Sequence, residues 1–192
     1  VLGPWHQAGP YPADAKAGFD PSFPPLQGDL DLSQPCGGKP WVARPDLVDG
    51  VGHGLTAPDR SATFLGRLIT APAPVAIRGY CGSDDGLAVW LNGQRLLAHP
   101  ANRGYGPNQD VAEMALRAGE NRLLLMIYNN QGGHGFYFST DPTPGSARQG
   151  ALTRLWARLA TDFPEPEAQR EMAWEREAGI WSEPWPPGEI AV

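Results

Sequence analysis

The sequence predicts a mainly β domain, a β-sandwich or barrel, with an irregular extension at each end. Short apolar runs separated by turn residues recur between residues 61 and 140, which is typical of an antiparallel β domain rather than of βαβ units. Glycine and proline number 24 and 21 among 192 residues, about twice their usual combined share of roughly 12%. Hydrophobic residues still make up 41% of the chain, so one core of ordinary size can form.

Residues 1–60 are the first segment of the predicted organisation. Pro, Gly and Asp dominate it, and no helical or strand period survives for more than a few residues. We interpret this segment as an irregular, Pro-rich wrap that packs on the core, or as a linker. Its expected anchors are five aromatic side chains, Trp5, Tyr11, Phe19, Phe23 and Trp41.

Residues 61–140 are predicted to form the core of the sandwich. Residues 75–81 alternate in side-chain character, as a strand with one buried face does. Asn92-Gly93 is the strongest hairpin signal in the chain, because both central residues of a type I′ turn need a positive φ. The expected strands are residues 64–69, 75–81, 87–91, 94–97, 111–117, 122–128 and 136–138.

Residues 141–192 change character and predict a short helical, Trp- and Pro-rich C-terminal extension. One amphipathic helical stripe is formed by residues at i, i+3, i+4 and i+7, namely Leu152, Leu155, Trp156 and Leu159. A second short helix is expected over residues 166–178, before an aromatic and proline-rich tail.

Charge and cysteine content narrow the class of protein. The net charge of −6 and the pI near 5.1 argue against a nucleic-acid partner, because phosphate binding needs clustered cations. No run of about 18 apolar residues occurs, so we expect no membrane span in this chain. The chain lacks an initiator Met and a signal-peptide pattern, so residue 1 is expected to be a processed or trimmed end. Cys36 and Cys81 allow one disulfide, which export would favour; the alternative is two free, buried thiols.

Three segments resemble a known family of domains. Residues 82–93 place a serine, two acids and a glycine before an apolar run and an Asn-Gly turn, and residues 116–123 and 132–138 follow in matching order and spacing. Together they resemble the protective-antigen-type and galactose-binding-like jelly rolls, which are lectin-like β-sandwiches of exported bacterial proteins. Residues 2–5 also resemble the Gly-Pro-Phe start that precedes such domains. The resemblance implies a jelly-roll fold over residues 61–140 and an extracytoplasmic location, in the periplasm or at the cell surface.

The same resemblance implies a role for two adjacent acids, Asp84 and Asp85. In the fungal adhesin branch of the family, paired acids bind calcium and sugar hydroxyls together, and calcium takes six to eight oxygen ligands. Carrying this over needs further oxygen donors from another loop. Asn129, Asn130 and Gln131 are candidates, and Asn129 is taken as the metal ligand. The rest of the adhesin calcium loop is not recognisable in this sequence. The alternative is structural, with Ser83, Asp84 and Asp85 capping backbone N–H groups in a tight turn before Gly86.

Two polar loops, residues 99–110 and 129–134, supply further candidate ligand groups. Planar amides and a guanidinium suit sugar hydroxyls, and an aromatic face suits a pyranose ring. The alternative for both loops is a hydrogen-bonded closure of one end of the sandwich. With Asp84 and Asp85, the candidate ligand-binding residues are Asn102, Arg103, Tyr105, Asn129, Asn130 and His134.

Catalysis is not expected from the sequence. It contains no nucleophile elbow, phosphate loop or dinucleotide fingerprint, and its histidines lack zinc-ligand spacing. Some relatives of the family carry c-type haem domains, but no Cys-x-x-Cys-His occurs here, so we expect no haem bound by that route. Asp84 and Asp110 can be imagined as a glycosidase pair, but the sequence does not give their distance.

Two classes of function follow. The first is a non-catalytic, extracytoplasmic carbohydrate-binding module, assisted by calcium. The second is a structural or docking accessory subunit of a larger envelope complex, for example one for electron transfer, held by the N-terminal wrap and the Trp-rich tail. Tryptophan is enriched at binding hot spots, and the alternative for the tail is that its helices fold back on the sandwich. The candidate partner-binding residues are Trp156, Trp174, Trp181 and Trp185.

Overall fold

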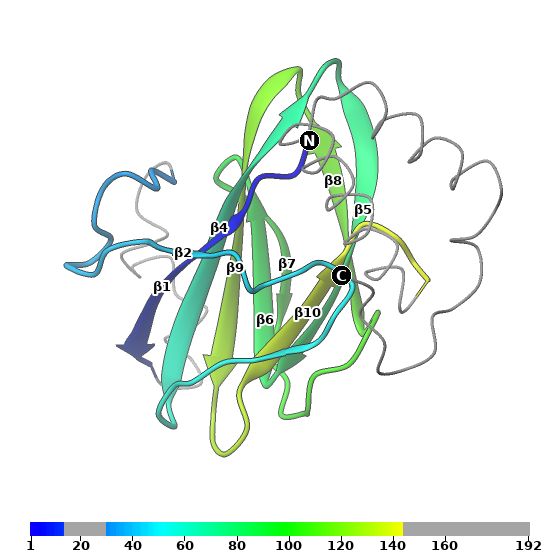
Figure 1. The fold of residues 1–192 in the computed structure, drawn as a ribbon. Coiled ribbons are helices and arrows are strands. Elements are labelled where there is room, and N and C mark those ends of the chain that lie inside the picture. The colour runs from blue at the N-terminus through cyan, green and yellow to red at the C-terminus, as the bar shows by residue number, and fades with distance from the viewer. Residues whose placement is uncertain (14–29, 144–192) are drawn as a thin grey trace, which may run out of the picture. The chain divides into compact units, whose positions relative to one another are not determined.

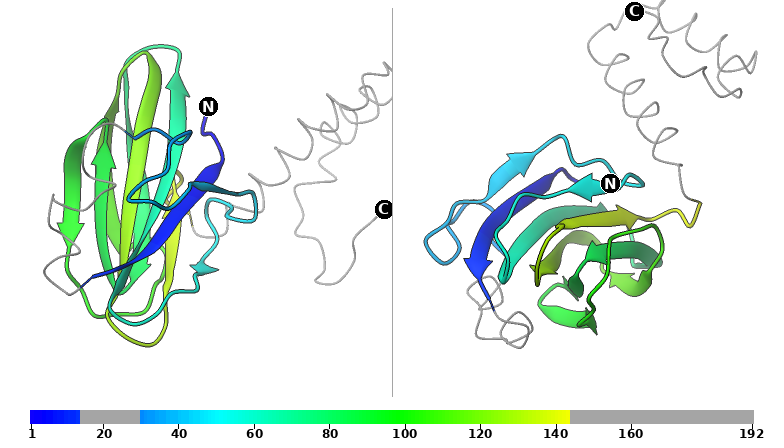
Figure 2. Two further views of the ribbon diagram at one scale, coloured as in Figure 1. Left: turned by 90° about the vertical axis from the view of Figure 1, so that its left-hand side faces the viewer. Right: turned by 90° about the horizontal axis from the view of Figure 1, so that it is seen from below.

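The computed structural model describes residues 1–13 and 30–143, all within Val1–Arg148, the first of two units into which the chain divides. The described residues form two antiparallel sheets that pack on one another as layers (Figure 1 and Figure 2). The predicted mainly β sandwich is therefore confirmed. Its assignment to the jelly-roll type stays a prediction, and the predicted helices and tail of residues 144–192 lie outside the described residues.

The two sheets contain six and four strands. The six-stranded sheet has the order β2 (Val42–Arg44), β1 (Trp5–Pro12), β4 (Ser61–Ala71), β9 (Gly119–Asn129), β6 (Gly86–Leu91) and β7 (Gln94–His99). The four-stranded sheet has the order β3 (His53–Gly54), β10 (Gly135–Ser139), β5 (Val75–Asp84) and β8 (Asp110–Leu116).

The predicted hairpin at Asn92-Gly93 joins β6 to β7. Both residues have a positive φ, 50° for Asn92 and 79° for Gly93, and the flanking residues Leu91 and Gln94 pair across the strands. This is the backbone that a two-residue type I′ turn requires. Asn92 also donates its side-chain Nδ2 to Asn121 Oδ1 at 2.9 Å, which ties the hairpin to the start of β9.

The N-terminal segment differs from the predicted irregular wrap. Residues 5–12 form β1, which pairs with β4 and so extends the central sheet, and β2 and β3 also come from the first 60 residues. Gly9 has a φ of 108° and the register shifts between Ala8 and Tyr11, which breaks the alternation that would mark a strand in the sequence. Residues 5–12 form a strand despite their glycine and prolines, because strand formation depends on tertiary context and β4 supplies a pairing partner.

Alternation along the strands places the main core between the sheets. Trp5 is 1% exposed and meets Phe136 and Phe138 edge to face, with ring centroids 5.9 and 5.3 Å apart. These contacts join β1 to the four-stranded sheet. The other fully buried large side chains of this cluster are Leu65, Ile69, Leu87, Met114, Leu123, Leu125 and Ile127.

The opposite face of the six-stranded sheet carries a second apolar cluster. Tyr11, Phe64, Trp90, Met126 and Tyr128 are all buried there, on β1, β4, β6 and β9. Because β6 and most of β9 are buried on both faces, their sequences are continuous apolar runs instead of alternating ones.

Cys36 and Cys81 are free, so the predicted disulfide does not form. The thiol of Cys81 points into the main core between the sheets, where burial raises its pKa. The Cys36 carbonyl accepts a hydrogen bond from Tyr11 Oη at 2.5 Å, and Tyr11 belongs to the second apolar cluster. The six-stranded sheet therefore lies between the two cysteines, which explains why they do not meet.

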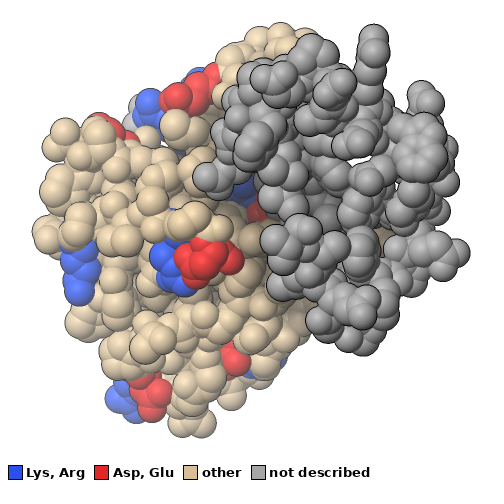
Figure 3. Space-filling model, viewed as in Figure 1, with Lys and Arg blue, Asp and Glu red and all other residues tan. Residues whose placement is uncertain are grey.

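On the face drawn in Figure 3, the charged side chains of the described residues are few, and opposite charges lie beside one another. Among the described residues, Arg44 and Asp46 form an ion pair, with Nη2 and Oδ2 2.6 Å apart. Within the described residues, no helix is long and apolar enough to cross a membrane.

Candidate functional site

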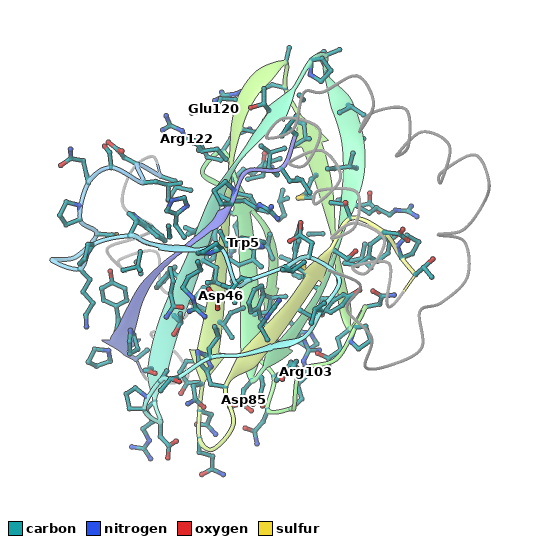
Figure 4. The ribbon with its side chains drawn as sticks, viewed as in Figure 1. Trp5, Asp46, Asp85, Arg103, Glu120 and Arg122 are labelled. Atoms are coloured by element: carbon teal, nitrogen blue, oxygen red, sulfur yellow. The ribbon has the colours of Figure 1, made fainter. Side chains whose placement is uncertain are left out.

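Asp84 and Asp85 lie where the chain passes from the four-stranded sheet to the six-stranded sheet. Asp84 ends β5, Gly86 begins β6, and the Asp84–Asp85 peptide bond is cis. Figure 4 shows Asp85 and Arg103 close together at one end of the sandwich, with Glu120 and Arg122 at the other end. The two loops singled out in the sequence, residues 99–110 and 129–134, meet at the Asp85 end.

Asp85 holds these two loops together from the inside. Its side chain is 4% exposed, and its Oδ1 and Oδ2 accept the backbone N–H groups of Arg103 at 3.0 Å and Asn130 at 2.8 Å. Its own N–H donates to the Tyr128 carbonyl at 2.8 Å, and its carbonyl accepts the Ser83 hydroxyl at 2.7 Å. Hydrogen bonds to an ionised carboxylate are about twice as strong as neutral ones. Asp85 is thus the capping residue that the structural alternative anticipated.

Asp84 is in the opposite situation. Its carboxylate is half-buried, and none of the described residues donates a hydrogen bond to it or pairs with it. It lies against Gly133, where a Cβ would stand 2.6 Å from Oδ2, so a side chain at this position would displace the Asp84 carboxylate. Burial, followed by the negative charge of Asp85, raises the pKa of Asp84 above its ordinary value of 3.8. Asp84 is therefore the carboxylate that this end of the sandwich offers to a ligand.

The ring of Tyr105 lies in a notch between two glycines. A Cβ on Gly52 would stand 2.6 Å from this ring and a Cβ on Gly135 would stand 2.4 Å from it, yet Tyr105 remains 38% exposed. Gly135 is the residue opposite Asp84 in the β5–β10 pair. The Tyr105 ring therefore packs against the residue that pairs with Asp84 across the four-stranded sheet.

The remainder of loop 99–110 is fixed by its own polar contacts. The Arg103 guanidinium pairs with Asp110 and donates to Ser83 Oγ at 3.1 Å, and His99 Nδ1 lies 2.7 Å from Asp110 Oδ1. Gln109 accepts the Ser83 N–H at 3.1 Å and donates to the loop itself. The charge of the Arg103 guanidinium is therefore balanced by Asp110. Arg103 contacts Asp85 through its backbone N–H and not through its guanidinium.

The exposed amides at this end come from both loops. Asn130 Nδ2 donates to Asn102 Oδ1 at 3.2 Å, and Asn102 is exposed to solvent. An amide has two donors and one acceptor oxygen, so this pair keeps further hydrogen-bonding capacity for a ligand.

Asn129 and His134 point into the interior. Asn129 is fully buried and donates Nδ2 to the carbonyls of Ala57 at 3.3 Å and Pro58 at 3.2 Å. His134 is 6% exposed, with Nδ1 3.1 Å from the Asp84 carbonyl and Nε2 3.0 Å from Thr63 Oγ1. Because a carbonyl only accepts, Nδ1 carries the proton of a neutral ring and Nε2 accepts from Thr63. Burial lowers the pKa of His134 below 6.5, against smaller opposing effects of Asp84 and Asp85.

The expected calcium ligands, Asp84, Asp85 and Asn129, do not form a calcium shell by themselves. Each oxygen of Asp85 already accepts a backbone N–H, and the Asn129 amide is turned toward the Ala57 carbonyl. Among the described residues, no group of three or more His, Cys, Asp or Glu side chains is placed to hold a metal ion. A calcium ion at Asp84 would need most of its six to eight oxygens from elsewhere.

The sequence indicated the two loops that meet at this site, residues 99–110 and 129–134, but not the glycines against which loop 99–110 packs. Gly82 is the tightest example, because its Cβ would lie 1.8 Å from the Gly106 carbonyl oxygen. A glycine inside a predicted strand is the available signal for such a close approach of another segment. The tryptophans proposed as partner contacts, Trp156, Trp174, Trp181 and Trp185, lie outside the described residues, so the docking function stays a prediction.

No family model matches this chain, and no curated protein matches it. Among solved structures, it is similar to an anti-sigma factor domain-containing protein from Clostridium clariflavum (14% identity, TM-score 0.39, 72% of this chain and 41% of that chain). It is also similar to the PA14 sugar-binding domain from an RTX adhesin (12%, TM-score 0.41, 72% and 88%). A third is the carbohydrate-binding module CBM36 in complex with calcium and xylotriose (15%, TM-score 0.24, 46% and 88%). The match spans less than half of the clostridial protein. At these identities and TM-scores, function has to be decided by the geometry of the site.

Proposed function

We propose that the Asp85 end of the sandwich is a carbohydrate-binding surface and that the domain is a non-catalytic binding module. The observation that carries the proposal is the Asp84 carboxylate, which has no partner among the described residues. It lies against Gly133, two positions before Gly135, which the exposed Tyr105 ring contacts. The Asn102–Asn130 amide pair lies on the same two loops. Sugar hydroxyls donate to carboxylates and amides, while the apolar face of a pyranose packs on an aromatic ring.

Rigidity is the second argument for a binding surface. A site gains affinity when its groups are held in place before the ligand arrives. Asp85 ties both loops to one buried carboxylate, and the notch between Gly52 and Gly135 fixes the Tyr105 ring. The ligand-facing groups are thus preformed by contacts that face the interior.

The carboxylates at this end argue for binding rather than hydrolysis. Glycoside hydrolysis uses two carboxyl groups, one on each side of the scissile bond. Asp110 is engaged by Arg103 and His99, and Asp85 accepts two backbone N–H groups. The imagined pair of Asp84 with Asp110 therefore has only one unengaged member.

A binding titration with matched variants tests the proposal. We would screen the 192-residue chain on a glycan array and measure the best ligands by calorimetry, with calcium and with chelator. Asp84→Asn and Tyr105→Ala should each weaken binding about tenfold or more, whereas Glu113→Gln, an exposed acid on β8, should bind like the parent. Failure to bind any glycan at about 1 mM, or equal affinity of Asp84→Asn and the parent, would contradict it.

Calcium assistance and an extracytoplasmic location are finer parts of the same proposal. The chelator arm tests the first, because calcium-assisted binding should disappear with chelator and return with added calcium. The second is tested by fractionating cells that express the natural gene and by following the protein with an antibody.

A further inference from the structure

The Asp85 end of the sandwich carries more negative than positive charge. Its acids are Asp59, Asp84, Asp85 and Asp110, and its arginines are Arg60 and Arg103. Arg103 is taken up by Asp110, so it does not offset the other acids. No ion pair of the described residues includes Asp84 or Asp85, and a ligand that enters here meets an uncompensated carboxylate.

The uncompensated carboxylate and the exposed ring lie within the reach of one ligand. The Asp84 carboxylate touches Gly133 and the Tyr105 ring touches Gly135. These glycines are two positions apart in the chain, which places their Cα atoms at most about 7 Å apart. One sugar unit can therefore contact both groups.

An ammonium group is the substituent that satisfies both of them. It donates hydrogen bonds to a carboxylate, which are strengthened by the opposite charges. It is also attracted by the face of an aromatic ring, as cations generally are. A carboxylate or sulfate on the ligand would instead meet the like charge of Asp84, and the Arg103 guanidinium at this end is already paired with Asp110.

Resting on the proposed carbohydrate binding, we infer that this site selects amino sugars with a free, protonated amine and rejects acidic sugars. The amine binds Asp84, and the sugar ring packs against Tyr105. For an amino sugar, the positive charge that a calcium ion would bring to Asp84 comes from the ligand itself, so the binding of this class of sugar needs no metal. Asp84 is the residue that determines this specificity, while Asp85 positions the loops.

Three oligosaccharides of equal length test the inference by calorimetry in the presence of chelator. They are a glucosamine tetramer, its N-acetylated counterpart and a galacturonic acid tetramer. The glucosamine tetramer should bind about tenfold more tightly than the N-acetylated one, and the galacturonate should not bind. Added salt should reduce the difference between the first two, because screening weakens the charge contact.

Variants separate this specificity from binding itself. Asp84→Asn should bring the glucosamine and N-acetylglucosamine tetramers to equal affinity, and Glu113→Gln should leave the tenfold preference intact. Thermal melting of each variant verifies that it is folded. If neutral sugars bind without any preference for the amine, or the preference survives in Asp84→Asn, the inference is overturned and the carbohydrate-binding proposal stands. If no sugar of any charge binds, both are overturned.

Discussion

Replacing Asp85 by alanine tests whether one buried carboxylate holds the ligand loops. The substitution removes the acceptor of two backbone N–H groups, those of Arg103 and Asn130, at 3.0 and 2.8 Å. A hydrogen bond to a charged group contributes about 1.5–3 kcal/mol, and a buried donor left without a partner costs a similar amount. Both loops are only half-buried, so water recovers part of the loss. We expect the free energy of unfolding to fall by about 3 kcal/mol.

The neighbouring residue supplies the control. Asp84→Asn removes the same charge one position earlier, where the carboxylate has no partner among the described residues, so stability should change by less than about 0.5 kcal/mol. Asp85→Asn should fall between the two, because its amide keeps one acceptor oxygen for one of the two N–H groups. This isosteric variant also serves if the alanine variant does not fold.

Urea unfolding gives the stabilities, and amide hydrogen exchange locates the effect. In Asp85→Ala, the amides of Arg103 and Asn130 should lose protection, while those in the centre of the β4–β9 pair should exchange as in the parent after correction for global stability. The reasoning is refuted if Asp85→Ala is within about 1 kcal/mol of Asp84→Asn, or if the two amides keep their protection.

Three other predictions follow from the same structure. Since burial lowers the pKa of His134 below its ordinary 6.5, the unfolded chain takes up the proton first. Stability is therefore complete above about pH 6.5 and decreases as the pH falls below it, and urea unfolding should show a flatter pH dependence for His134→Gln. Gly82→Ala should cost about 1–3 kcal/mol and weaken glycan binding, because its Cβ would lie 1.8 Å from the Gly106 carbonyl, whereas Gly104→Ala meets nothing within 4 Å and should do neither. Both cysteines should react with a thiol reagent in denaturant without prior reduction, and one equivalent or none would indicate a disulfide or another modification.

The sandwich core was predictable where side-chain pattern and turn chemistry agreed. Asn92-Gly93 fixed a hairpin because few residue pairs accept two positive φ angles, and the structure has that turn. Residues 5–12 were not predicted as a strand, because a glycine and two prolines interrupt the pattern and only the pairing with β4 stabilises it. The strand from residue 61 was predicted to start later, since Ser61 and Thr63 are polar residues buried at the loop end of the sandwich.

The sequence predicted which segments form the candidate site, but not which of their side chains point outward and which point into the interior. The sequence grouped residues 99–110 and 129–134 with Asp84 and Asp85 as one candidate site, and hydrogen bonds from both loops to the Asp85 carboxylate show that these segments meet. The sequence does not say that His134 turns inward, since its direction depends on bonds to Thr63 and Asp84 across two sheets. Cys36 and Cys81 likewise lie on opposite sides of a sheet whose N-terminal strand was not foreseen.

Two identical neighbours, Asp84 and Asp85, have unlike roles because they stand where one sheet gives way to the other. Asp84 ends β5 and lies against Gly133, where no N–H of the described residues donates to its carboxylate. Asp85 is the next residue, and its carboxylate accepts N–H groups from both loops. From the sequence motif alone, two adjacent acids are expected to have the same role. The half-buried Asp84 depends on the buried Asp85, because Asp85 accepts a backbone N–H from each of the loops that carry Tyr105 and Asn130. Two variants should therefore weaken ligand binding for different reasons. Asp84→Asn removes the group that selects the ligand, whereas Asp85→Ala disorders the loops that carry the other contacts.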